Sequence, residues 1–163
     1  MNEQTYDSVD EAMRAIYQAI FDAFESKMHL IGSVIDADAR REIIAQKIVD
    51  RGDFYANAGY LVEANATGIT LRVGSNVRHE PYVLGGKVPS WTPIAPLIAW
   101  VQRKGLSWVD KKSGAQLKVE QIAYMIRAKI HREGIEARNV YETVIKNRES
   151  WIFEQLNGIE VRV

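Results

Sequence analysis

Residues 81–105 read PYVLGGKVPSWTPIAPLIAWVQRKG and contain all four prolines of the chain. The Gly85-Gly86 pair releases the backbone, and the residues before the later prolines are held extended because proline disfavours the helical conformation of its predecessor. Thr92-Pro93 is typical of a helix start, with Thr as the cap and Pro at the first helical position, and Gly105 predicts the helix end. The segment therefore places a β region before residue 85 and a helix after residue 92.

The β region is expected over about residues 55–84. Residues 69–73 alternate apolar and polar side chains after the turn signal Thr67-Gly68, which is the pattern of a half-buried strand. Residues 60–63 are the natural hairpin partner. Residues 79–84 can return as a third strand at an edge, because their proline has no amide proton to donate. These patterns predict an antiparallel meander.

The amino-terminal region, about residues 8–51, has the apolar period of an α-helix. Ser8 with Glu11 three residues later is a capping-box pattern, which predicts a helix that runs to about residue 30. Gly32 and Ser33 interrupt the pattern. The sequence therefore leaves open whether this region holds one kinked helix or two.

The second half of the chain is expected to be helical over about residues 93–157, with Gly134 and Gly158 marking two helix ends. Residues 159–163 alternate apolar and charged side chains and fit a last strand added to the sheet. We predict one α+β domain over residues 1–163, an antiparallel meander sheet packed by N-terminal, central and C-terminal helices.

Composition and charge narrow the classes of function. The absence of cysteine excludes disulfides, thiolate metal sites and thiol nucleophiles. No apolar run approaches the ~20 residues of a membrane span, and the start lacks a secretion signal, so we expect a chain that stays where it is made and has no membrane partner. The net charge is zero, yet residues 1–100 carry 9 Lys and Arg against 13 Asp and Glu, and residues 101–163 carry 12 against 8. Such ends suit stacking of copies, although ordinary scatter gives the same asymmetry.

No pattern predicts a reacting centre. The three histidines, His29, His79 and His131, fall in separate elements and lack ligand spacing, so no metal site is expected. Gly85-Gly86-Lys87 lacks the spacing of a phosphate loop and is expected to be a hinge. We therefore assign no catalytic, cofactor-binding or metal-binding residue and expect a protein that is not an enzyme.

The residues around the hinge are candidates for an interface. A tryptophan in a proline-flanked loop is a candidate anchor for a partner subunit, because Trp is enriched in interface hot spots. We expect this arm to project from the β layer and to contact an adjacent copy. The candidate interface residues are Gly85, Gly86, Lys87 and Trp91.

Several segments carry a resemblance by their order. They are Gly52-Asp53-Phe54 with Tyr55 to Ala58, the hairpin end Leu71 to Ser75, Pro81-Tyr82-Val83 with Gly85-Gly86 leading to Pro96 to Gly105, and Ile122 to Ile130 with Gly134-Ile135 and Arg138-Asn139-Val140. Over about residues 50–145, this order resembles the tail-component family of long-tailed bacteriophages, which are neck or tail-completion proteins of the head-tail junction. Gly52-Asp53-Phe54 stands where that family has Thr-Gly-x-Leu, and no Glu follows Tyr82 before the glycines.

The resemblance implies a structural protein of a virion or prophage tail, assembled in the cytoplasm of the host bacterium. It implies a ring of copies that contacts the head-tail connector or adaptor and the tail terminator or tail tube, with DNA passing through the lumen. Two other hypotheses stay open: an unrecognised hydrolase, and a small nucleic-acid-binding module that uses the basic carboxy-terminal helices. The basic residues of those helices are Arg127, Lys129, Arg132, Arg138, Lys146 and Arg148.

Overall fold

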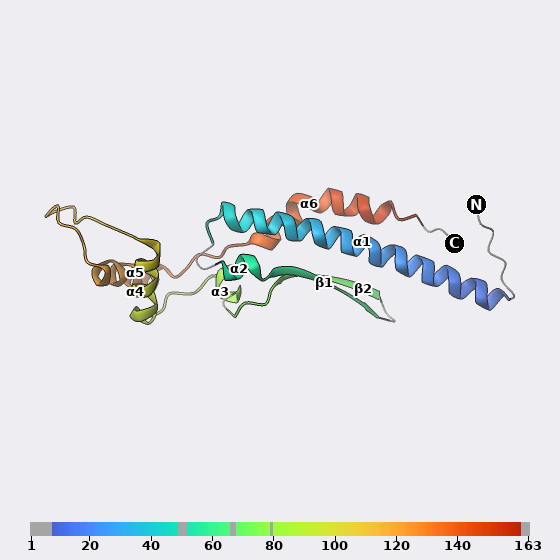
Figure 1. Cartoon of the computed structure of the whole chain (residues 1–163), viewed down its shortest axis with the longest axis horizontal. Helices are drawn as coiled ribbons and strands as arrows, with labels where there is room; N and C mark the ends of the chain where they lie inside the picture. Colours follow the sequence, from blue (N-terminus) through green and yellow to red (C-terminus); the bar gives the residue numbers. More distant parts are fainter. Residues whose placement is uncertain (1–7, 49–51, 66–67, 79, 161–163) are drawn as a thin grey trace. The chain divides into compact units, whose positions relative to one another are not determined.

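The computed structural model describes residues 8–48, 52–65, 68–78 and 80–160 (Figure 1). Over these residues the fold is α+β, as predicted, with six helices and one two-stranded antiparallel sheet. The chain divides into two compact units, where the sequence analysis expects one domain. We name residues 1–77 with 140–163 the helix–hairpin unit, and residues 78–139 the insert unit.

The helix–hairpin unit is built on one long helix, α1 (Val9–Ala45). It begins as predicted, because the Ser8 hydroxyl accepts a hydrogen bond from the Glu11 amide at 3.2 Å. The helix then continues through Gly32 and Ser33, so the amino-terminal region holds one helix over these residues. The Ser33 hydroxyl bonds back to the Leu30 carbonyl at 2.8 Å, which keeps it within the helical turn.

Gly32 serves close packing and does not break α1. A Cβ atom at this position would lie 2.8 Å from Cγ of Tyr60 and 2.9 Å from Cδ1 of Leu71. Both side chains belong to the hairpin that follows, so the glycine lets the sheet approach the helix closely. The glycine that we interpreted as a helix interruption therefore marks a close contact between α1 and the hairpin.

The hairpin pairs β1 (Ala58–Asn65) with β2 (Gly68–Ser75) in antiparallel register, with Tyr60 opposite Val73 and Val62 opposite Leu71. Its inner side chains Leu71 and Val73 pack on a core cluster in which Ile31 and Ile35 of α1 are buried. This confirms the predicted hairpin and the inward alternation of its second strand.

The predicted third strand is wrong. Residues 80–84 form the short helix α3 (Glu80–Leu84), with no strand beyond β1 and β2 among the described parts of the chain. Pro81 lies in the first turn of α3, where its missing amide proton costs nothing, and its carbonyl accepts a bond from the Gly85 amide at 2.9 Å. The proline that we interpreted as an edge-strand residue thus begins a helical turn.

The last helix, α6 (Val140–Asn157), completes the helix–hairpin unit and ends beside Gly158 as predicted. Within this unit, Figure 1 shows α1 between α6 and the hairpin. Lys27 donates to Gln155 at 3.2 Å, and Arg148 pairs with Asp38 at 2.6 Å. Residues 159–160 form no strand, and residues 161–163 of the predicted last strand lie outside the described residues.

The insert unit has its own core between α4 (Ile94–Lys104) and α5 (Val119–Glu133). Val101, Ile122 and Ala123 are buried there. The predicted ends at Gly105 and Gly134 are confirmed, and Gly105 adopts the left-handed conformation at φ 58°. The predicted start is one residue early.

The start of α4 differs from the prediction in its capping residue. Pro93 is the cap and makes no side-chain hydrogen bond, and α4 begins at the next residue. The Thr92 hydroxyl is buried without a hydrogen-bond partner, so it does not cap the helix. The sequence therefore places α4 correctly and its cap incorrectly.

Candidate interface of the insert unit

The proline-rich arm, residues 85–92, is bound by its backbone within the insert unit. Lys87 and Ile135 exchange two backbone hydrogen bonds, each 2.8 Å long. Nearby, the Arg138 amide donates to the Val83 carbonyl at 2.9 Å. We expected the arm to project, but it does not project freely, because its backbone is held by the segment that follows α5.

Gly86 is required by this close approach. It lies at φ 68°, and a Cβ atom there would be 2.5 Å from the Ile135 carbonyl oxygen and 2.8 Å from the Ala137 nitrogen. Gly85 has no positive φ in the structure and is exposed. The pair that we predicted as a hinge thus contains one glycine that fits two chain segments together.

Trp91 lies near the end of the arm, with about half of its surface, 53%, exposed. Its indole stacks on the His131 imidazole, with centroids 4.2 Å apart and an 18° angle between the planes. The Arg127 guanidinium carbon lies 4.4 Å from the indole centroid. His131 and Arg127 are four residues apart on α5, so one helix face holds the candidate anchor.

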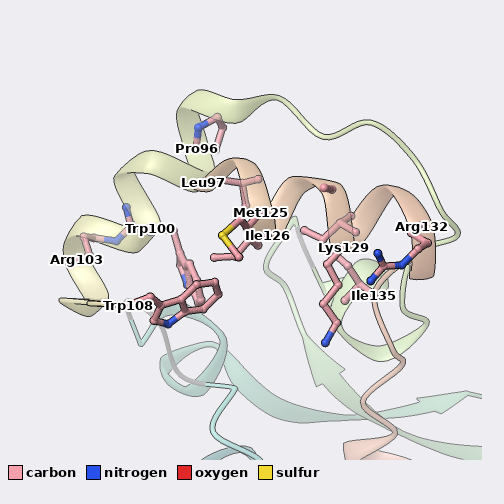
Figure 2. Close-up of a pocket in the computed structure, with 13 residues that line it drawn as sticks. Pro96, Leu97, Trp100, Arg103, Trp108, Met125, Ile126, Lys129, Arg132 and Ile135 are labelled. Carbon is pink, nitrogen blue, oxygen red and sulfur yellow. The ribbon is translucent and has the colours of Figure 1, made fainter. Parts of the chain in front are cut away.

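A groove of about 870 Å³ lies between α4 and α5 (Figure 2). Its apolar wall is formed by Leu97, Trp100, Trp108, Met125, Ile126 and Ile135. Figure 2 shows the two indoles beside each other at one end and the side chains of Lys129, Arg132 and Ile135 toward the other. None of the candidate interface residues lines this groove, so sequence reasoning missed it.

The charged residues that line the groove are all basic. They are Arg103 from α4 and Lys129 and Arg132 from α5. Glu133 lies close by, 2.6 Å from Arg132 and 3.8 Å from Lys129, and these cations hold the pKa of its carboxyl below the ordinary value through the Arg132 hydrogen bond first. With Glu133 counted, the three cations leave the rim with a net positive charge, so the groove combines an apolar wall with a basic rim.

Opposite charge is separated between the two units. The insert unit contains 11 Lys and Arg and 5 Asp and Glu, a net charge of +6. The helix–hairpin unit contains 10 and 16, a net charge of −6. The asymmetry between the two halves of the sequence therefore follows the boundary between the units and is larger there.

The histidines and carboxylates form no cluster of three or more that could hold a metal ion in the part of the chain that the structure describes. His29 lies edge-on to Tyr60 with centroids 6.0 Å apart, His131 stacks on Trp91, and His79 lies outside the described residues. None of the described helices is long and apolar enough to cross a membrane.

The basic residues that suggested a nucleic-acid surface are divided between the units. Arg127, Lys129, Arg132 and Arg138 belong to the insert unit, whereas Lys146 and Arg148 belong to α6 of the helix–hairpin unit. Arg148 pairs with Asp38 at 2.6 Å, so its charge is compensated. The basic residues that we grouped from the sequence therefore belong to two different units of the fold.

No family model, curated protein or solved structure matches the chain.

Proposed function

We propose that the chain is a structural component of a tailed-phage virion or prophage, a tail-completion or neck protein that assembles as a ring at the head-tail junction. The observation that carries the proposal is the separation of net charge, −6 on one unit and +6 on the other. A subunit of this kind attracts copies of itself when unlike units meet. Contacts between unlike surfaces of identical subunits close into rings when the rotation allows it.

The placement of the resembling segments supports the same function. Gly85-Gly86 and Gly134-Ile135 lie far apart in the sequence, and the backbone bonds between Lys87 and Ile135 bring them together. Gly52 to Ala58 lies against α1, where the Arg40 guanidinium donates to the Tyr55 carbonyl at 2.7 Å and to the Ala58 carbonyl. The residues that carry the resemblance therefore occupy positions where chain segments join.

In this role the chain works as a joint, and its expected partners are further copies, the connector or adaptor and the tail terminator or tail tube. The groove between α4 and α5 and the exposed part of Trp91 are the surfaces on the insert unit that suit such contacts. DNA would pass through the ring without a base-specific contact, and no cofactor is needed.

The proposal can be tested on virus particles that are produced by a lysogen carrying the gene. We expect the chain to purify together with virions. We also expect a gold-labelled antibody against the chain to mark the head-tail junction. Deletion of the gene should give full heads and separate tails, and expression of the wild-type chain in trans should rejoin them. Joined, infectious particles from the deletion strain, with the chain absent from wild-type virions, would contradict the proposal.

One observation favours a nucleic-acid-binding module as a second candidate. Trp100 and Trp108 line the same groove as three basic side chains, and aromatic rings combined with cations bind single-stranded nucleic acid by stacking and phosphate contact. The discriminating measurement is the affinity for single-stranded DNA over a salt series, which falls steeply if phosphate contacts dominate. The groove lining contains no carboxylate and gives no support to a hydrolase.

A further inference from the structure

The first half of α1 has an apolar face that the described residues of its own unit leave unburied. Between Ser8 and Leu30 no described residue is buried, whereas Ile31 begins a series of buried residues that continues to Ile43. The exposed fraction is 79% for Val9 and 65% for Tyr17. The core of the helix–hairpin unit thus covers only the second half of the helix.

The residues of this uncovered half repeat at helical spacing. Val9, Met13, Ile16, Ile20 and Phe24 return every three or four positions and form one stripe. A stripe of this width normally packs against another element, because isolated helices are marginal in water and gain most of their stability from such packing. We name residues 9–27 of α1 the free helix segment.

The free helix segment belongs to the acidic unit of the chain. The helix–hairpin unit has a net charge of −6, and the insert unit has a net charge of +6. Two helix–hairpin units side by side would bring like net charges together, which disfavours pairing of two free helix segments with each other. An apolar surface of the insert unit is a better match.

The chain itself provides that surface in the groove between α4 and α5. Its apolar wall includes Met125, which is 50% exposed, and its charged lining consists of Arg103, Lys129 and Arg132. Amphipathic helices bind hydrophobic grooves through an apolar stripe, and flanking charges set partner and orientation. The stripe and the groove are therefore both apolar, and they belong to units of opposite net charge.

We infer that the free helix segment of one copy docks in the α4–α5 groove of a second copy. The inference rests on the self-assembly in the proposed function and names its contact. Met13, Ile20 and their neighbours on the stripe lie against the apolar wall of the groove. Each copy offers one segment and one groove, so the contact is heterologous and repeats from copy to copy.

Two full-length variants test the contact. Val9→Glu with Met13→Glu charges the stripe and keeps the groove, whereas Met125→Glu charges the groove and keeps the stripe. All three side chains are exposed in the single chain, so the substitutions leave each unit's core unchanged. Each variant alone should lose at least about tenfold in association constant, because a charge would be buried at the contact.

Mixing the two variants gives the decisive result. The mixture contains one intact segment and one intact groove, so we expect heterodimers of one copy of each and no larger species by mass measurement. The matched controls are Ser26→Glu, which is off the stripe, and Tyr124→Glu, which is exposed on α5 and does not line the groove. Both controls should associate as the wild type does.

Three outcomes would overturn the inference. One is a groove variant that associates as the wild type does, another is a mixture that stays monomeric, and the third is a groove that binds single-stranded DNA while the chain alone stays monomeric. If the wild type associates and neither variant weakens it, this contact is wrong and the ring proposal stands. The virion experiment gives its result independently.

Discussion

Lys87 and Ile135 hold each other by two backbone hydrogen bonds of 2.8 Å, which join the proline-rich arm to the segment after α5. The arm is therefore a fixed part of the insert unit. Its residue Gly86 lies where a side chain would meet the Ile135 carbonyl. In the same arm, Trp91 is half exposed and stacks on His131 of α5.

Substitution of Gly86 tests this junction. Gly86→Ala should lower the free energy of unfolding by more than about 2 kcal/mol, because the left-handed backbone costs about 1–2 kcal/mol for a residue with a Cβ and the contact with Ile135 adds to it. Gly105→Ala is the matched control, since Gly105 has a similar φ of 58° and a Cβ atom there would meet nothing within 4 Å. Chemical denaturation measures both, and equal losses would show that the close approach costs nothing.

Gly32→Ala should destabilise the helix–hairpin unit although alanine favours helices by about 1 kcal/mol over glycine. The reason is the overlap of its methyl group with Tyr60 and Leu71. In a Tyr60→Ala background the same substitution should become less harmful, because part of the overlap is gone. A double-mutant cycle on the free energy of unfolding measures this coupling, and additive effects would contradict the packing role of Gly32.

Arg127 and Trp91 should show a coupling energy of about 0.5–1 kcal/mol, the usual range for an exposed cation–π contact. Arg127→Met keeps most of the side-chain length and removes the charge, and Trp91→Leu removes the ring. The measurement is a double-mutant cycle by chemical denaturation, with Arg132→Met as the control because Arg132 pairs with Glu133. If the coupling energy between Arg127 and Trp91 equals that between Arg132 and Trp91, the result would argue against the contact.

Asp110 should make the stability of the loop after Trp108 dependent on pH. Backbone hydrogen bonds from Ser113 first and Lys112 second hold the pKa of its carboxyl below the ordinary value. A lowered folded pKa means that the stabilisation is present above the unfolded pKa and is lost as pH falls through the folded pKa. Amide exchange at Lys112 and Ser113 should therefore rise in acid.

Asp110→Asn provides the control for that pH dependence. The amide oxygen can still accept from the backbone of Lys112 and Ser113 but does not titrate. Exchange at these two amides, corrected for the intrinsic effect of pH, should be flat in the variant. A wild-type profile that is equally flat would contradict the role of the carboxylate.

Local signals predicted the elements that depend on local chemistry. The Ser8 cap, the hairpin alternation and the stop at Gly105 each act within a few residues, and the structure confirms them. Pro81 misled the prediction because a proline fits both an edge strand and a first helical turn. The sequence could not show which of these conformations its neighbours would select.

The groove and the bound arm depend on contacts between distant residues, which no local pattern reports. From the sequence alone Gly32 is interpreted as a helix breaker, and only the position of Tyr60 beside it shows its packing role. Trp100 and Met125 each fit an ordinary core position, and only the pairing of α4 with α5 leaves them on an open wall. One signal was present in the sequence, the excess of basic residues after residue 100, and the unit boundary shows its extent.

The mass of the full-length chain over a range from micromolar to millimolar, at low and at high salt, tests the central claim of self-assembly most directly. We predict that the mass rises with concentration and that high salt weakens the association, because exposed charges are screened beyond about 10 Å at 0.1 M salt. A chain that remains monomeric at every concentration and salt condition would contradict the account.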